Sequence, residues 1–280
     1  MIETTVVGWD GTEPAVAALS WAIDEPPGRT LRLVRVAGKD VSDAETFAAN
    51  SPAALARVAL IDEAERIRRA HPDRKVTSEL VTGDPVDELA RRSNASTLVV
   101  VGTGRRHGGS AKYGWSVGAR LAGVAQGPVA IIPVTNGSRR GGIVVGIDGS
   151  AASDVALRYA AAEAVRLGVP LRAIRAWQPP PTWAGASVPA PDYLRSLEEM
   201  YTHVLDDALE EVLLQYPDLD LGRTVVRAPA HTALLGASRT AALLVVGNHG
   251  LRGLKRLLLG SVSHSVIINA QSPVVVVRAD

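Results

Sequence analysis

The sequence predicts an α/β protein made of two tandem doubly wound domains, each with a five-stranded parallel sheet flanked by helices. Three observations support this fold. The second half of the chain repeats the first, short apolar runs of strand length alternate with longer amphipathic runs, and glycine-containing turns follow the apolar runs. Alternation of this kind is typical of parallel sheets with helices on both faces. A chain of 280 residues is long enough for two domains of common size.

The internal repeat covers a whole domain. The first apolar run reads TTVVGWDGT from Thr4 and GIVVGIDGS from Gly142, an offset of 138 residues. Later in each half, LVVVGTG from Leu98 matches LLVVGNH from Leu243, an offset of 145 residues. A period of about 140 residues is far longer than a solenoid unit. We therefore predict a first domain over residues 1–135, a polar, glycine-rich linker over 136–142, and a second domain over 143–280.

The second half gives the order of elements most clearly. It opens with an apolar strand over 143–147, and Ser150 then caps an amphipathic helix that extends to residue 167. A second strand over 171–177 is followed by a proline-rich segment and a long helix over 193–216 with apolar residues at helical spacing. A strand over 223–227, a short helix over 230–239, and strands over 243–246 and 273–278 complete the order.

Ligands of doubly wound sheets bind beyond the carboxyl ends of the strands, near the point where strand order reverses. The first and fourth strands of the second half end in Gly-Ile-Asp-Gly and Gly-Asn-His-Gly. We expect these two loops to face one crevice.

A glycine motif follows the fourth strand of the second half. Gly247, Gly250 and Gly260 are spaced by two and then nine residues, and Ser261 comes directly after Gly260. Backbone N–H groups approach an oxyanion closely where side chains are missing, and a helix start adds the positive end of its dipole. We expect Ser261 to be the N-cap of a helix over 262–269, and we favour a phosphate site over ordinary turn punctuation.

These residues carry a resemblance to a known family. The motif Val-Val-Gly-x-Asp-Gly-[Ser/Thr], present in both halves, and the intact glycine motif of the second half are similar to those of the universal stress protein family. The resemblance covers nearly the whole chain. It implies the adenine nucleotide alpha hydrolase-like fold and an ATP-binding protein that acts as a nucleotide-dependent sensor or regulator in the stress response.

The resemblance also implies which residues bind the nucleotide. ATP would lie in the second domain, with the glycine motif at the triphosphate and ribose, an aspartate at the nucleoside, and the backbone of the second strand at the adenine edge. Matched by position, the implied residues are Ile147, Asp148, Ala176, Val246, Gly247, Gly250, Gly260, Ser261 and Val262. For Asp148 an alternative is that Asp-Gly-Ser simply caps the following helix.

The first domain departs from the family pattern. Arg105 stands where the second glycine is expected and Trp115 stands where Gly260 is found, so large side chains replace absent ones. We therefore expect nucleotide binding in the second domain and a weaker candidate site in the first. The residues of that weaker site are Asp10, Val36, Gly102 and Ser116.

Composition and motifs narrow the function. A net charge of +1 gives no electrostatic footprint for nucleic acid or an anionic membrane, and the N-terminus lacks a secretion signal, so we expect a cytoplasmic protein. No nucleophile elbow, paired-histidine metal motif or Walker phosphate loop is present. We expect a protein that is not an enzyme, apart from slow ATP hydrolysis, and a Mg²⁺ ion held through the phosphates rather than by a protein metal site. The alternative function is a nucleotide-independent scaffold that acts through protein contacts.

Assembly is predicted from the fifth strands. The segments 130–134 and 274–277 are short and apolar, and exposed strand edges of this kind pair with other strands. We expect the two domains to pair within the chain through these strands, with a homodimer of the whole chain as a further assembly.

Overall fold

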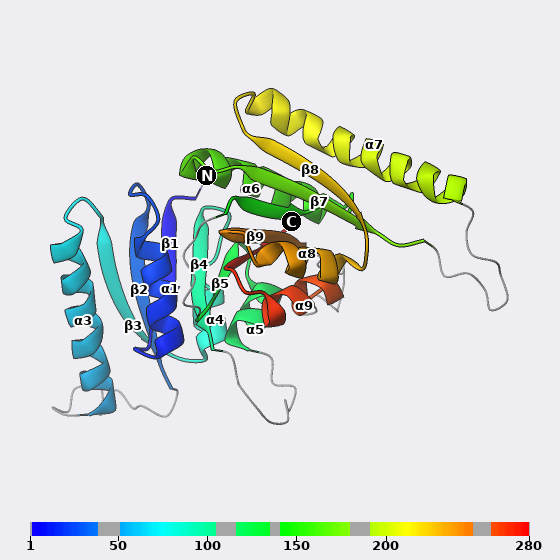
Figure 1. The fold of residues 1–280 in the computed structure, drawn as a ribbon. Helices are drawn as coiled ribbons and strands as arrows, with labels where there is room; N and C mark the ends of the chain where they lie inside the picture. The colour runs from blue at the N-terminus through cyan, green and yellow to red at the C-terminus, as the bar shows by residue number, and fades with distance from the viewer. Residues whose placement is uncertain are drawn as a thin grey trace, which may run out of the picture. The chain divides into compact units, whose positions relative to one another are not determined.

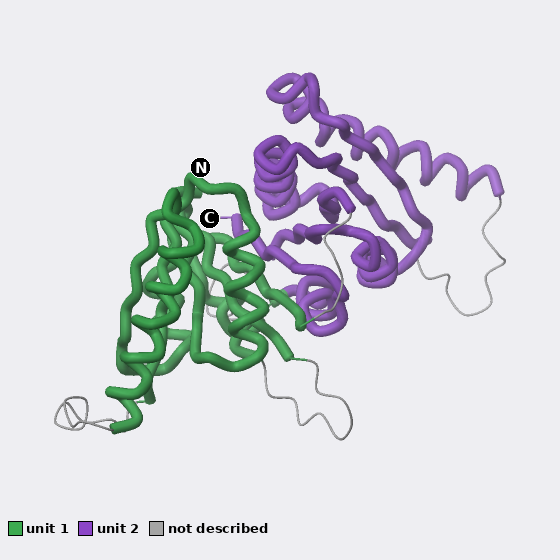
Figure 2. Tube along the Cα trace, turned by 60° about the vertical axis from the view of Figure 1, so that its left-hand side comes forward, with its two compact units in different colours: residues 1–136, 250–259, 280 green, residues 137–249, 260–279 purple. Residues whose placement is uncertain are grey.

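A computed structural model of the chain describes residues 2–38, 51–104, 116–134, 141–179, 191–248 and 259–279. The described residues divide into two compact units, shown in green and purple in Figure 2. Of these residues, those between 2 and 134 and Leu259 belong to the first unit, and residues 141–179, 191–248 and 260–279 belong to the second.

Strands and helices alternate in both units (Figure 1). The first unit consists of β1 (Thr4–Gly8), α1 (Glu13–Ile23), β2 (Thr30–Ala37), α3 (Pro52–Ala70), β3 (Val76–Thr82), α4 (Pro85–Ala90), β4 (Thr97–Thr103), α5 (Val117–Val124) and β5 (Val129–Pro133). The second consists of β6 (Ile143–Gly146), α6 (Ala151–Leu167), β7 (Leu171–Trp177), α7 (Pro191–Gln215), β8 (Leu221–Arg227), α8 (Ala230–Ser238), β9 (Leu243–Asn248), α9 (Ser261–Asn269) and β10 (Val274–Arg278).

The two units share one sheet topology. The strand order is β3-β2-β1-β4-β5 in the first unit and β8-β7-β6-β9-β10 in the second, and the strands pair in parallel. Strand order therefore reverses between β1 and β4, and again between β6 and β9, which are the places where doubly wound sheets bind ligands. The predicted fold class is confirmed.

Burial explains why the central strands are almost wholly apolar. The inner residues of β1, β4, β6 and β9 are buried, because helices cover both faces of each sheet. In the second unit α6 and α7 pack together on the sheet, while α8 and α9 pack together, α8 on β6 and β7 and α9 on β9 and β10. Helix α6 begins as predicted, with Ser150 as its N-cap, and it ends at Gly168, whose φ of +64° suits glycine.

Several predicted boundaries need correction. The long helix α7 spans Pro191–Gln215 rather than 193–216, β8 begins at Leu221 rather than at 223, and β9 continues to Asn248 rather than ending at 246. Helix α9 begins at Ser261, and Gly260 is its N-cap, so the prediction that Ser261 is the cap was wrong by one residue. Glycine and serine are both favoured at this position, so local sequence does not separate them. The first strand of the second unit ends at Gly146 rather than Ile147.

Gly142, the last residue of the predicted linker, accepts a hydrogen bond from the backbone N–H of Ala242.

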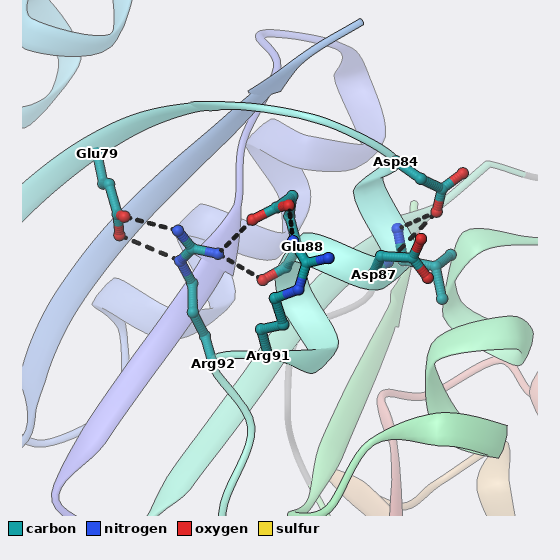
Figure 3. Close-up of polar contacts among 7 residues, drawn as sticks. Glu79, Asp84, Asp87, Glu88, Arg91 and Arg92 are labelled. Carbon is teal, nitrogen blue, oxygen red and sulfur yellow. Dashed lines mark hydrogen bonds and ion pairs between the residues drawn. The ribbon is translucent and has the colours of Figure 1, made fainter. Parts of the chain in front are cut away.

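A charge network connects α4 and the residues just after it to the middle of β3 in the first unit (Figure 3). The Arg92 guanidinium donates to both carboxylate oxygens of Glu79, at 2.6 and 3.1 Å, and to Oε2 of Glu88 at 3.1 Å. Arg91 also donates to Glu88. The hydrogen bonds from Arg92 hold the pKa of Glu79 below its ordinary value, and the two carboxylates raise the pKa of Arg92.

Replacing Arg92 by glutamine should lower the free energy of unfolding by about 2 kcal/mol at neutral pH, because it removes charge-assisted hydrogen bonds to two carboxylates. The pKa of Glu79 is lower in the folded state, so its contribution is fully present above the unfolded pKa of about 4.3. It is lost as the pH falls through the folded value. Urea unfolding of wild type and variant between pH 7 and 3 should show the difference shrinking below about pH 4.5.

The exposed pair Arg66–Glu63 supplies the control. The Arg66 side chain is 61% exposed and forms an ion pair with Glu63, one helical turn away on α3. Arg66→Gln should change the free energy of unfolding by no more than about 0.5 kcal/mol at any of these pH values. An Arg92→Gln effect as small as this, or one that grows as the pH falls, would contradict the assigned role.

Candidate functional site

A cavity of about 180 Å³ opens where β6 and β9 end in the second unit. It therefore lies at the reversal of strand order. The loop after β6, strands β7 and β9, and helices α6, α8 and α9 all contribute to its walls. Its lining residues are Gly146, Ile147, Asp148, Ser150, Ser153, Ile174, Ala176, Ala230, Leu234, Val246, Gly247, Gly260, Ser261, Val262 and Ser263.

Asp148 lies at the cavity and also closes the turn that starts α6. Its Oδ1 accepts hydrogen bonds from the backbone N–H of Ser150 at 3.0 Å and from the Ser150 hydroxyl at 2.5 Å. The Ser150 Oγ in turn accepts from the N–H of Ser153 at 3.2 Å and caps the helix. The turn residue Gly149 has a φ of +81°, which glycine adopts without strain. Ser150 is thus the cap, and the exposed Asp148 carboxylate is held in place by the turn.

Gly247 is required by packing. A Cβ at this position would lie 2.5 Å from the carbonyl oxygen of Ala152 in the first turn of α6. Because that neighbour is backbone, it could not move aside without shifting the helix. The close approach of Ala152 therefore supports a structural role for this glycine.

Gly260 is different. Its φ of −60° and ψ of 152° are open to most residues, and among the described residues the nearest neighbour of an added Cβ would be the Oγ of Ser263, at 3.9 Å. The fold itself does not require a glycine here. Space is left beside the start of α9, on the side that lines the cavity.

The first turn of α9 faces this space without a side-chain cap. Gly260 has no side chain to accept from the N–H groups of Ser261, Val262 and Ser263, and no side-chain cap is formed at this helix start. All three residues line the cavity. Uncapped N–H groups and the positive end of the helix dipole together favour an anion at this point.

The opposite side of the cavity is apolar. Ile174 and Leu234 are 5% and 4% exposed, and Ala176, Ala230 and Val246 complete this wall. Leu234 can approach β6 because residue 146 is glycine, at which a Cβ would lie 3.0 Å from the Leu234 side chain. The site therefore combines an apolar wall, one carboxylate and one uncapped helix start.

Comparison with known proteins identifies the family. The sequence pattern of the Universal stress protein family matches residues 1–133 and again residues 140–278. The chain belongs to the universal stress protein family.

Two curated relatives match this universal stress protein over nearly their whole length. The chain is 32% identical over 304 residues to Universal stress protein Rv1996 of Mycobacterium tuberculosis, covering 98% of this chain and 94% of that one. It is 33% identical over 290 residues to Universal stress protein Mb2028c of Mycobacterium bovis, covering 98% and 96%. The crystal structure of a universal stress protein from Archaeoglobus fulgidus has the same fold, with a TM-score of 0.67, 21% identity and 98% of each chain covered.

The structure of this universal stress protein brings most of the predicted site residues together. Eight of the nine predicted for the second domain line the one cavity, namely Ile147, Asp148, Ala176, Val246, Gly247, Gly260, Ser261 and Val262. The ninth, Gly250, lies outside the described residues.

Other lining residues were missed at the sequence level. Ile174 lies two positions before Ala176 on the same face of β7, so the strand period could have indicated it. Ala230 and Leu234 lie four residues apart on one face of the predicted helix α8. Ser153 and Ser263 are buried serines whose place at the cavity depends on tertiary contacts, and no local signal marks them.

The weaker candidate site of the first unit has a different helix start. Asp10 makes the same turn as Asp148, accepting from the N–H and hydroxyl of Thr12 at 2.9 and 2.6 Å, and Val36 lies near the end of β2. Gly102 is packed even more tightly than Gly247, with a Cβ position 1.9 Å from the Pro14 carbonyl oxygen. However, Ser116 caps α5 through its Oγ, which accepts from the N–H of Ala119 at 3.2 Å.

Two further properties of the described residues bear on the site. They contain no group of three or more metal-ligating side chains. None of their helices has both the length and the apolar character needed to cross a bilayer. Arg105 and Trp115 lie outside the described residues.

Proposed function

We propose that this universal stress protein binds ATP in the cavity of its second unit and acts as a nucleotide-dependent sensor or regulator. The family resemblance assigns a nucleotide role to nine residues, and eight of them line one cavity. That convergence is independent of the resemblance, because the cavity is defined by geometry alone.

The observation that carries the proposal is the contrast between the two helix starts. In the first unit the Ser116 side chain satisfies an N–H group of α5, whereas in the second unit α9 has no side-chain cap. Gly260, which the fold does not require, leaves the first turn of α9 accessible. The triphosphate would accept hydrogen bonds from the N–H groups of Ser261 and Val262. The first unit would bind nucleotide weakly.

The remaining walls suit the nucleoside. The Asp148 carboxylate accepts hydrogen bonds and would bind the ribose hydroxyls, while its turn keeps it oriented. The backbone of Ala176 would bind the adenine edge, with the base against Ile174 and Leu234. A cavity of about 180 Å³ is smaller than the roughly 300–1,000 Å³ of pockets that enclose a whole ligand, so the phosphates would extend along α9.

The chemistry of the walls favours binding over turnover. Asp148 is the only carboxylate among the described lining residues, and it is engaged in the turn before α6. The described lining residues therefore place no base to activate water at the first turn of α9, so ATP would act as a bound signal. A Mg²⁺ ion would be held mainly by the phosphates, with its charge offsetting theirs.

We also propose that the domains pair within the chain through β5 and β10. Each is an edge strand of its own unit, bonded to β4 and β9 respectively. This pairing, a cytoplasmic location and a further homodimer are expectations from the sequence, and they are not needed for the nucleotide site.

The test is equilibrium binding of labelled ATP to the whole chain, combined with hydrogen exchange. We expect one ATP per chain, with exchange slowed at the N–H groups of residues 261–263 in α9. Residues 117–119, the first three of α5 as 261–263 are the first three of α9, are the internal control and should be unaffected, because Ser116 already caps that helix. Absence of ATP binding at millimolar concentration would favour the alternative function, a nucleotide-independent scaffold. Equal protection in both helices would contradict the assignment to the second unit.

A further inference from the structure

The two ends of the glycine motif are held together by two buried side chains that do not belong to the motif. Asn248, the last residue of β9, accepts a hydrogen bond at its Oδ1 from the backbone N–H of Gly260 at 3.3 Å. Ser263, in the first turn of α9, donates through its Oγ to the carbonyl oxygen of Gly247 at 2.8 Å. Both side chains are almost fully buried, at 1% and 4% exposed. We call this pair of hydrogen bonds the neck clamp.

We propose that Asn248 is a positioning residue for phosphate and that it acts through the neck clamp. The proposal rests on the proposed ATP site and deepens it. Asn248 does not line the cavity, but it bonds Gly260, the residue directly before the uncapped N–H groups. Its amide oxygen thereby sets where the first turn of α9 begins relative to the end of β9.

The bond to Gly260 also decides which N–H groups remain for a ligand. The Gly260 N–H is used by Asn248, so the donors that face the cavity are those of Ser261, Val262 and Ser263. An array fixed before binding loses little conformational freedom on binding, and this favours affinity. Since the clamp touches the phosphate end of the site, its effect should be confined to ligands that carry phosphate.

The described residues of the first unit do not reproduce the two side chains of the clamp. At the offset of 145 residues, Thr103 stands at the position of Asn248, and Gly118 stands at the position of Ser263. A Cβ at Gly118 would lie 2.9 Å from the Ile131 side chain, so the serine has no room in that unit. Asn248 and Ser263 therefore accompany the uncapped helix start, and other residues stand at their places in the unit whose helix is capped by Ser116.

The experiment measures affinity for ATP and for adenosine in the whole chain carrying Asn248→Ala. ATP affinity should fall by about tenfold, while adenosine affinity should stay within about twofold of wild type. Ser263→Ala removes the second bond of the clamp and should change the same ratio in the same direction. Thermal unfolding shows whether the Asn248→Ala variant is folded. If it is not, Ser263→Ala provides the second test.

The matched control is Asn269→Ala. Asn269 lies at the other end of α9, where its side chain donates to the carbonyl oxygen of Ser265 at 2.9 Å on the exposed side. This variant should leave both affinities unchanged.

The outcomes separate the clamp from the proposed function. If wild type binds ATP more tightly than adenosine and Asn248→Ala leaves that ratio unchanged, or lowers both affinities equally, the clamp proposal is overturned and the ATP site stands. If wild type shows no preference for ATP over adenosine, the phosphate site itself is wrong, and the clamp proposal falls with it.

Discussion

A chain carrying Gly260→Trp is expected to lose ATP binding by at least roughly a hundredfold while remaining folded. The backbone at residue 260 has ordinary angles, and no atom of the described part of the chain lies closer than 3.9 Å to an added Cβ. An indole at this position would instead cover the first-turn N–H groups of α9, where the phosphates are proposed to bind. Calorimetric titration with ATP measures the loss, and circular dichroism verifies the fold.

Gly222 offers a control in the same unit. It lies on the exposed strand β8, and its added Cβ would have only the Leu171 carbonyl oxygen within reach, at 4.0 Å. Gly222→Trp should therefore keep wild-type ATP affinity. Undiminished binding by Gly260→Trp would exclude the start of α9 as the phosphate site.

Gly247→Ala is expected to give the largest loss of stability, about 3 kcal/mol in the free energy of unfolding. The new methyl group would lie 2.5 Å from the Ala152 carbonyl oxygen and 2.6 Å from the carbonyl carbon. Relief requires α6 to move away from β9, which disturbs the core that these two elements share. Urea unfolding, monitored by hydrogen exchange in the second unit, measures the loss of stability.

Gly236→Ala is the matched control for Gly247→Ala. Residue 236 lies within α8, where an added Cβ meets nothing within 4 Å, and alanine is the better helix former. This change should stabilise the second unit by about 0.5–1 kcal/mol. If Gly247→Ala were as benign as Gly236→Ala, the packing role of Gly247 would be wrong.

The sequence predicts much of the architecture because its signals are local. The strand Leu171–Trp177 and the capped helix that ends at Leu167 are found where the apolar runs and cap residues placed them. The crevice between the first and fourth strands follows from topology, which the strand and helix order defines. The start of α9 was misplaced because Gly260 and Ser261 are both acceptable caps.

Features that depend on distant contacts could not be predicted in this way. Gly247 and Gly260 look alike in the motif, yet only Gly247 packs against a backbone carbonyl from α6. The hydrogen bonds of Asn248 and Ser263 join residues 12 and 16 positions apart. Nothing in the local sequence marks those two side chains as partners of the glycine motif.

The difference between the two glycines has an evolutionary consequence. After a gene duplication, a glycine that holds a helix against the sheet stays under selection in both copies, and Gly102 and Gly247 are both present. A glycine needed only for the proposed nucleotide site could be replaced in the copy that is proposed to bind nucleotide weakly. At the place of Gly260 the first copy carries Trp115. Comparing the two halves of one chain therefore separates the glycines that the fold requires from the glycine that the proposed ligand requires.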